Sequence, residues 1–494
     1  MGIRVIIDGA AQNAAPGVLL SELLSQLDKP CGGSGRCGKC RVYASGALSA
    51  PSEQEKKLLG DALHDGIRLA CMTRAEGDCT VETIKKSAAV VCTDGEKVLP
   101  APSPAFTKYG AAVDIGTTTL AARLFDRAGR CVAEAGAANP ESAWGADVIS
   151  RIEAVLAGNG HAIAVCIREA VAALLLEMAE SAGISPADID GTVITGNTVM
   201  LHLLTETSPE PLSHAPFKAE RLFGETLGAA SLGLPVSGEV YLPPCIAAFI
   251  GADTVTAALA AGFDAPQDAT RLLCDIGTNG EMLLAHEGAL YACSTAAGPA
   301  FEGAGISMGM GGRPGAIDRV TVEDGILRAH VIGDIAPVGI CGSGIVDAAA
   351  CLLETEALDE TGFLEDDDAV IAAPVVLTQE DIRKIQLAKS AIHAGIRTLL
   401  HTAHAPIDAV AALLIAGGFG SYLDPVNAGK IGLLPEELAA RCKPLGNAAL
   451  TGAAMLLLDT ARRASACALC ADVQVVELAA NPVFVREYTE RMLF

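Results

Sequence analysis

The chain has 494 residues, which is too many for one hydrophobic core, so two or more domains are expected. Hydrophobic residues make up 51% and charged residues 19%, a globular composition, and the net charge of −24 argues against a nucleic-acid partner. The sequence shows no signal-peptide pattern and no apolar run long enough to span a bilayer, so we expect a cytoplasmic protein with no membrane partner.

The first predicted elements lie within residues 1–85, which we assign to one domain. Residues 3–7 have the pattern of an apolar strand that ends at the turn Asp8-Gly9, and residues 18–24 have the pattern of an amphipathic helix. Residues 86–108 are then expected to form a linker. The segment from Leu99 to Ala105 carries three prolines, which is typical of an extended linker, and we expect it to be a free, flexible connection that lets the first domain move.

Four cysteines in the first domain have the spacing of metal ligands. Cys31, Cys37, Cys40 and Cys71 form the pattern C-x5-C-x2-C-x30-C. The glycines between the first three allow the backbone to wrap closely around a compact cluster, because glycine tolerates positive φ. Sixteen cysteines in a long chain without a secretion signal favour metal ligands or buried thiols over a disulfide framework.

The pattern resembles adrenodoxin-like [2Fe–2S] ferredoxin domains, in which Leu69-Ala70-Cys71 matches the arrival of the fourth ligand. The resemblance implies a β-grasp fold and one [2Fe–2S] cluster bound by the four cysteines. A zinc site is the alternative, although the other C-x2-C pair, Cys467 and Cys470, lies about four hundred residues away. Cys79 and Cys92 are alternative fourth ligands.

Beyond Tyr109, short apolar strands that end in glycine alternate with Ala/Leu-rich helices, which predicts α/β layers. Residues 112–119 and 273–280 share the core Asp-Ile-Gly-Thr, each after an apolar strand. We therefore expect a duplicated domain with one lobe over residues 109–262 and a second lobe, with terminal helices, over residues 263–494.

Each repeat places an aspartate at a strand end, before a small-residue turn with exposed N–H and hydroxyl donors. Such donors suit phosphate oxygens, and the aspartates Asp114 and Asp275 can hold Mg²⁺ directly or through water. Either motif alone could simply form an ordinary βα turn, without binding a phosphate. A third segment, from Leu414 to Gly420, is an apolar strand that runs into glycines able to lie flat against an adenosine.

These segments resemble the phosphate and adenosine motifs of the acetate-kinase/sugar-kinase/Hsp70/actin (ASKHA) superfamily, and no Walker A pattern is present. The resemblance implies a two-lobed ATPase. Asp253 opens a predicted helix as the catalytic aspartate of sugar kinases does, and Glu302 is a further candidate for catalysis. Asp253 could equally complement the helix dipole. The residues implied to bind the nucleotide are Gly116, Thr117, Thr118, Gly277, Thr278, Asn279, Gly417, Gly418 and Gly420.

Taken over its whole length, the sequence resembles the reductive activators of corrinoid-dependent enzymes, which join a [2Fe–2S] domain to an ASKHA domain. The stretches 196–200, 297–304, 339–344 and 481–484 also fit that family. The resemblance implies ATP-driven, one-electron reduction of a Co(II) corrinoid to Co(I). The implied partners are a corrinoid protein or corrinoid-dependent methyltransferase and a low-potential electron donor, and a homodimer is compatible with the superfamily. The alternatives are a redox-sensing, ferredoxin-fused small-molecule kinase and a nucleotide-switched module that binds a corrinoid protein.

Overall fold

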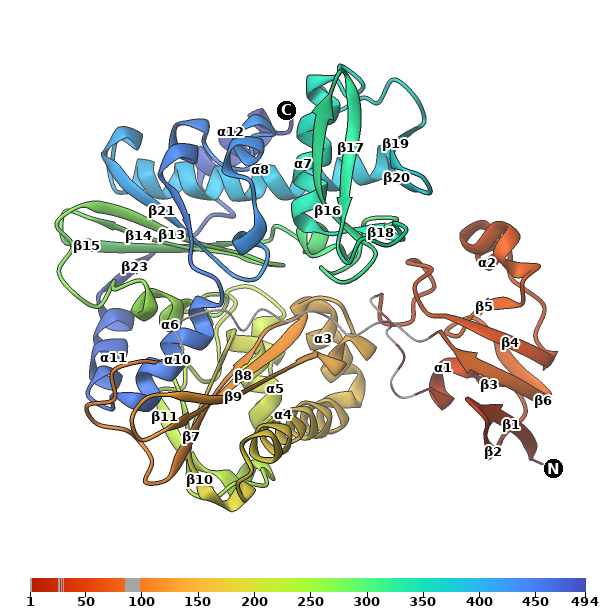
Figure 1. Cartoon of the computed structure of the whole chain (residues 1–494), viewed down its shortest axis with the longest axis horizontal. Coiled ribbons are helices and arrows are strands. Elements are labelled where there is room, and N and C mark those ends of the chain that lie inside the picture. Colours follow the sequence, from red (N-terminus) through yellow and green to blue (C-terminus); the bar gives the residue numbers. More distant parts are fainter. Residues whose placement is uncertain (1, 25–26, 28, 30, 85–97) are drawn as a thin grey trace. The chain divides into compact units, whose positions relative to one another are not determined.

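The computed structural model describes residues 2–24, 27, 29, 31–84 and 98–494. The chain forms two compact units (Figure 1). Unit 1 comprises Met1–Ser87 and Pro140–Cys166, and unit 2 comprises Ala88–Asn139 and Ile167–Phe494. None of the helices in the described ranges combines the length and the apolar character that crossing a membrane requires.

The N-terminal part of unit 1 is a mixed sheet with the order β2-β1-β6-β4-β5, in which β3 also pairs with β6. β1 and β6 run parallel at its centre and the other pairs are antiparallel, which is the β-grasp arrangement that the sequence predicts. Val5, Val42 and Val81 alternate inward and are fully buried. The elements are β1 (Ile3–Ile7), β2 (Ala10–Ala14), β3 (Val18–Leu19), α1 (Leu20–Leu23), β4 (Arg41–Leu48), α2 (Glu53–Leu59), β5 (Ile67–Leu69) and β6 (Arg74–Thr83).

Unit 2 contains two six-stranded sheets built on one plan. Their strand orders are β11-β12-β10-β7-β8-β9 and β22-β21-β13-β14-β15-β23. In each sheet a three-stranded antiparallel meander is followed by two parallel strands, so the predicted duplication is confirmed. The strands are β7 (Tyr109–Ile115), β8 (Thr119–Asp126), β9 (Cys131–Ala138), β10 (Ile189–Gly196), β11 (Glu225–Gly228), β12 (Glu239–Leu242), β13 (Thr270–Ile276), β14 (Gly280–His286), β15 (Ala289–Thr295), β21 (Val410–Ala416), β22 (Cys442–Pro444) and β23 (Val473–Val475).

Helices from distant parts of the sequence pack together in unit 2. α10 (Ala448–Leu458) contacts β7, β10 and α6 (Ala252–Ala260), although in sequence it follows β22 of the second sheet (Figure 1). The contact is close because Gly452 has no side chain: a Cβ there would lie 1.8 Å from the carbonyl oxygen of Thr256. α8 (Gln379–Thr402) contacts β14 and β15 and buries Ile385, Ile392 and Leu399.

The remaining elements extend the lobes. The helices are α3 (Val148–Ala154), α4 (Gly160–Ala182), α5 (Thr198–Thr205), α7 (Gly342–Glu354), α9 (Pro425–Lys430), α11 (Arg462–Asp472) and α12 (Pro482–Glu490). The further strands are β16 (Ala316–Glu323), β17 (Ile326–Val331), β18 (Gly339–Ile340), β19 (Asp368–Ala372) and β20 (Val375–Thr378).

The segment expected to be a linker is only partly described, since residues 86–97 lie outside the described ranges. From residue 98 onward it is extended, as predicted, but it is fixed along unit 2. The Ala105 N–H donates to the Leu457 carbonyl at 2.8 Å, and the Ser103 hydroxyl donates to Asp459 Oδ1 at 2.9 Å. Leu99 and Phe106 are buried in the core. The expectation that the prolines mark a free connection is therefore wrong for residues 99–105, because apolar side chains anchor the segment.

Candidate functional site

The four predicted cysteine ligands lie together as two pairs. Cys31, Cys37 and Cys40 lie before β4, and Cys71 follows β5. The Sγ atoms of Cys31 and Cys37 are 3.3 Å apart, and those of Cys40 and Cys71 are 3.2 Å apart. The chain can bring them together because Gly32, Gly33, Gly35 and Gly38 all have positive φ, which bends the backbone around the sulfurs.

Each pair combines one acidic thiol with one weakly acidic thiol. The hydrogen bond between Cys37 and Cys31 lowers the pKa of Cys31 to about 3, and the hydrogen bond between Cys40 and Cys71 lowers the pKa of Cys40 to about 7. The same two hydrogen bonds, followed by burial, raise the pKa values of Cys37 and Cys71. The loop therefore presents thiolate character, which metal binding requires.

The spacing of the sulfurs within each pair can be compared with that of thiolates bound to a metal. Two sulfurs bound at about 2.3 Å to one tetrahedral metal lie about 3.7 Å apart, so each pair is close to that spacing. Within the described ranges, no three His, Cys, Asp or Glu side chains are placed to share one metal ion. Cys79 lies within β6, opposite Val5, and Cys92 lies outside the described residues.

The two predicted phosphate loops are equivalent hairpin turns. One connects β7 to β8, with the Gly116 N–H donating to the Thr119 carbonyl at 2.9 Å. The other connects β13 to β14, with the Gly277 N–H donating to the Asn279 carbonyl at 3.1 Å. Both aspartates of the repeat therefore lie at the same place in their lobes, one residue before the end of the first strand of a meander.

Glu302 joins the two loops. Its carboxylate accepts a hydrogen bond from the Thr118 hydroxyl of the first loop and another, at 2.8 Å, from the Thr278 hydroxyl of the second. Glu302 ends the short turn Pro299–Glu302. The two loops consequently face each other within unit 2, with hydroxyl donors on both sides of one anionic group.

Several carboxyl groups lie beside these loops. Burial, followed by mutual repulsion, raises their pKa values. Burial, followed by the charge of Asp275, raises the pKa of Asp114 to about 7, although the Asn447 amide donates to it at 3.0 Å. Burial and Glu302 raise the pKa of Asp275 to about 6. Burial, Asp275 and Asp114 raise the pKa of Asp253, in the first turn of α6, to about 8. This concentration of negative charge favours a cation.

Glu281 belongs to the same group and was not among the predicted site residues. It lies directly opposite Asp275 in the β13–β14 ladder, so both side chains project from one face of the sheet. It is 5% exposed, and its pKa is raised well above the usual range by burial and by Asp253 and Asp275. The first lobe has Ala121 opposite Asp114, so a carboxylate at the position of Glu281 is a feature of the second lobe alone.

Two asparagines also lie at the loops and were not among the predicted site residues, although Asn197 belongs to the stretch 196–200 that fits the family. The Asn447 amide binds Asp114, and the Asn197 amide donates to the Thr117 hydroxyl at 3.2 Å while its oxygen caps α5. Each asparagine precedes a buried helix, which is the sequence pattern of an ordinary N-cap. Their second contacts become visible only in the folded chain.

The predicted adenosine segment lies next to the second phosphate loop. β21 runs parallel to β13, with Ala416 in register with Asp275. Gly417 follows with φ of 89°, and a Cβ there would lie 2.8 Å from Asp275 Oδ1. Gly418 continues the turn, and Gly420 packs against Ile415 so closely that a Cβ would lie 2.2 Å away. Glycine is required at both contacts, and the segment reaches the loop that carries Thr278 and Asn279.

Comparison with known proteins identifies the family of this chain. The model described as the RACo middle region matches residues 109–266, and the model of the C-terminal domain of RACo, the ASKHA domain, matches residues 269–494. The corrinoid activation enzyme RamQ of Eubacterium limosum is 36% identical over 421 residues, which cover 78% of this chain and 70% of RamQ. The chain belongs to the RACo family. The predicted resemblance to reductive activators of corrinoid-dependent enzymes and the ASKHA fold are thereby confirmed.

Two further comparisons agree with membership of the RACo family. A [Co(II) methylated amine-specific corrinoid protein] reductase of Methanosarcina barkeri is 27% identical over 388 residues, covering 72% of this chain and 71% of the reductase. A solved structure described as a reductive activator for corrinoid, iron-sulfur protein matches with a TM-score of 0.73 and 26% identity, covering 100% of this chain and 98% of that one. The likeness thus extends to the N-terminal sheet that carries the cysteines.

Proposed function

We propose that this RACo family chain is an ATP-dependent reductive activator that passes one electron to the Co(II) corrinoid of a partner protein and restores Co(I). The observation that carries the proposal is the presence, in one chain, of a paired four-cysteine site and two facing phosphate loops. The partner would be a corrinoid protein or a corrinoid-dependent methyltransferase. Relatives described as a corrinoid activation enzyme and a corrinoid protein reductase support this choice.

Cys31, Cys37, Cys40 and Cys71 would hold a [2Fe–2S] cluster, which would supply a one-electron carrier when bound. The donor set supports this assignment because its sulfurs are already paired, two for each iron. Cys31 and Cys37 are partly exposed, whereas Cys40 and Cys71 are buried. The first pair would therefore offer the shorter route between the cluster and a redox partner. A low-potential donor would reduce it.

Thr117, Thr118, Thr278 and Asn279, with the backbone of Gly116 and Gly277, would bind the ATP phosphates, and Gly417, Gly418 and Gly420 would contact the adenosine. Mg²⁺ would be held near Asp114 and Asp275 mainly through water and phosphate. Its preference for retained waters agrees with a site in which, among the described residues, no three acidic or thiol side chains can share an ion. A bound cation would also lower the raised pKa values of these carboxyl groups.

Asp253 would orient the water that attacks the terminal phosphate and accept its proton. Its pKa of about 8 is set by burial and by the repulsion of Asp275 and Asp114. Once a cation neutralises those two charges, Asp253 would be ionised near neutral pH and able to act as a base. Glu302 would release the hydroxyls of Thr118 and Thr278 to the phosphates as they bind. Coupling to ATP hydrolysis could supply several kcal/mol. Because 59 mV corresponds to about 1.4 kcal/mol per electron, this could offset a gap of a few hundred millivolts in reduction potential.

The deciding experiment mixes the full-length protein, a reductant and Mg–ATP with a Co(II) corrinoid protein and follows the Co(I) absorption band. We expect Co(I) to form with ATP and not with a non-hydrolysable analogue. The Asp275→Ala variant should form none. Phosphorylation of a small-molecule acceptor without Co(I) formation would instead identify a kinase, and ATP-controlled binding of the corrinoid protein without reduction would identify a switch module.

A further inference from the structure

Helix α2 lies between the two chain segments that carry the cysteines. The side-chain amide of Gln54 donates to the Gly35 carbonyl, in the loop of Cys31, Cys37 and Cys40, at 2.9 Å. The next residue, Glu55, accepts the Leu69 N–H at 2.8 Å, two residues before Cys71. Neighbouring side chains of one helix therefore hold the segments that provide the two cysteine pairs.

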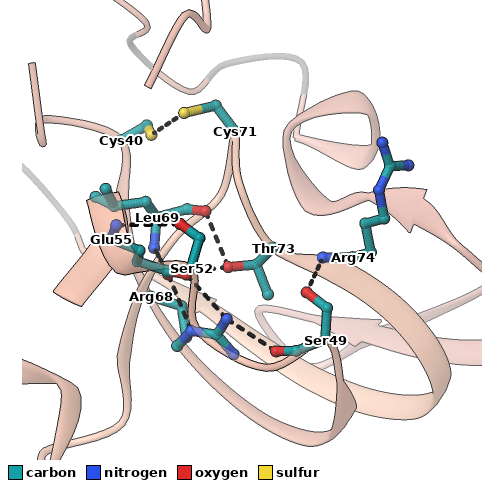
Figure 2. A network of polar contacts seen from close by, with 9 residues as sticks. All are labelled: Cys40, Ser49, Ser52, Glu55, Arg68, Leu69, Cys71, Thr73 and Arg74. Carbon is teal, nitrogen blue, oxygen red and sulfur yellow. Dashed lines mark hydrogen bonds and ion pairs between the residues drawn. The ribbon is translucent and has the colours of Figure 1, made fainter. Parts of the chain in front are cut away.

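Glu55 is fully buried. Figure 2 shows its side chain among Arg68, Leu69 and Thr73. Its two oxygens accept from Arg68 Nε at 2.9 Å and from Arg68 Nη2 at 3.0 Å, a bidentate ion pair that is itself buried. The Thr73 hydroxyl donates to the same carboxylate at 3.2 Å. Burial alone would raise the pKa of Glu55, but the hydrogen bonds from Arg68, Leu69 and Thr73 lower it, so the group is ionised.

The contacts of Glu55 involve residues on both sides of Cys71 in the sequence. Leu69 and Thr73, the two residues that flank it at a distance of two, both donate to Glu55, and the Thr73 hydroxyl also donates to the Leu69 carbonyl at 2.9 Å (Figure 2). Between them the Ala70 N–H donates to the Cys40 carbonyl at 2.9 Å. The turn that carries Cys71 is thus fixed to α2 and to Cys40 at the same time. A shift of the Glu55 contacts would move one sulfur of the Cys40–Cys71 pair.

We propose that Glu55, acting through Arg68, Leu69 and Thr73, is a positioning residue that sets the spacing of the Cys40–Cys71 pair and so retains the cluster. The inference rests on the proposed function, because it requires the four cysteines to bind a [2Fe–2S] cluster. The charge of Glu55 matters because removing one partner of a buried ion pair leaves the other unpaired. The surface ion pair Glu53–Lys56 on the same helix has no such role, since the Glu53 side chain is 90% exposed.

The test compares full-length Glu55→Gln with the matched control Glu53→Gln after anaerobic reconstitution with iron and sulfide. The readouts are bound iron and sulfide, the visible and electron paramagnetic resonance spectra, and the rate of cluster loss to a chelator. We expect Glu55→Gln to lose the cluster about tenfold faster or more and to change its spectrum, because a buried charged hydrogen bond is lost. Glu53→Gln should match the wild type in every readout.

A second variant keeps the test decisive if Glu55→Gln does not fold. Thr73→Val preserves the shape of a fully buried side chain and removes the hydroxyl that donates to Glu55 and to the Leu69 carbonyl. It should lose the cluster faster than the wild type by a smaller factor, about threefold to tenfold. Cluster loss at the wild-type rate in Thr73→Val, or in a folded Glu55→Gln, would overturn the positioning role. Failure of the wild type itself to take up a [2Fe–2S] cluster would refute the proposed function instead.

Discussion

At the scale of single residues, the fourth cysteine ligand has a direct test. Cys71 lies 3.2 Å from Cys40, whereas Cys79 is a buried thiol within β6. We expect Cys71→Ser to bind less iron or to shift the visible spectrum, because a hydroxyl replaces one thiolate donor of the second pair. Cys79→Ser should keep the wild-type iron content and spectrum. The reverse pattern in reconstituted proteins would assign the fourth position to Cys79.

The acidic residues at the phosphate loops predict how stability depends on pH. Asp114, Asp275 and Asp253 have pKa values raised to about 7, 6 and 8, first by burial and then by neighbouring carboxylates. Between about pH 4 and pH 8 these three groups bind more protons in the folded chain than in the unfolded chain, so their contribution to the free energy of unfolding falls as pH rises. Without Mg²⁺ and nucleotide, this contribution should lower the melting temperature as pH rises across this range.

Neutralising one of these carboxylates should oppose that decrease. Asp253→Asn should raise the melting temperature near pH 8 by a few degrees and flatten its dependence on pH, because it removes a buried charge that two neighbours repel. Asp408→Asn, at an exposed position, is the control and should leave the profile unchanged. Thermal denaturation across the pH series measures both. A profile that Asp253→Asn leaves as steep as in the wild type would contradict the assigned repulsion.

At the scale of secondary-structure elements, the sequence predicts the parts of the site that end strands and misses those that depend on pairing. The repeated Asp-Ile-Gly-Thr correctly predicts two equivalent turns, because an apolar strand before a small-residue turn is a local pattern. Glu281 joins the site only through its register opposite Asp275, and Asn447 only through its contact with Asp114. The contact between Asn447 and Asp114 joins distant segments and is not contained in a local pattern, whereas Glu281 directly follows the second repeat and only its register in the hairpin places it beside Asp275.

The segment of residues 99–105, which belongs to unit 2, shows a different kind of error. Its three prolines predict extended backbone correctly, but proline content carries no information about what the neighbouring side chains contact. Leu99 and Phe106 are buried in the core of unit 2, and Ala105 pairs with Leu457. Shortening residues 99–105 is therefore expected to destabilise unit 2, rather than only to restrict the movement of the first domain.

The turn after β21 yields a prediction at this scale. Gly417 has φ of 89°, and a Cβ there would approach Asp275 Oδ1 to 2.8 Å. We expect Gly417→Ala to weaken Mg–ATP binding by about tenfold or more, since a left-handed alanine costs about 1–2 kcal/mol and the new methyl group displaces Asp275. Isothermal titration calorimetry measures the affinity.

The control for Gly417→Ala is a glycine with the same backbone requirement and open surroundings. Gly325 has φ of 76°, and a Cβ there would meet no atom within 4 Å. Gly325→Ala should lower the melting temperature modestly and leave nucleotide affinity unchanged. Equal losses of affinity in both variants would show that backbone strain, and not the contact with Asp275, explains the effect.

At the scale of the whole molecule, the proposed function divides the chemistry between two parts of one chain. The cluster that the cysteines would hold needs only an electron donor to be reduced. The cysteines lie in the N-terminal part of the chain, beside β4 and β5. The residues proposed to use ATP lie in unit 2, on loops that face each other through Glu302. A substitution in unit 2 should therefore affect reduction of the corrinoid but not reduction of the cluster.

This difference gives the last prediction. Asp275→Ala should leave the [2Fe–2S] spectrum and its reduction by dithionite unchanged, because none of the cysteine ligands depends on Asp275. The same variant should lose ATP hydrolysis and Co(II) reduction together, since Asp275 is proposed to hold Mg²⁺ and neighbours Asp253, the proposed base. Cys71→Ser should show the converse, with ATP hydrolysis retained and Co(II) reduction lost. Parallel assays of cluster reduction, phosphate release and the Co(I) band separate these outcomes. If Asp275→Ala reduced the corrinoid protein as fully as the wild type, the driving force would come from the electron donor alone, and unit 2 would serve another purpose.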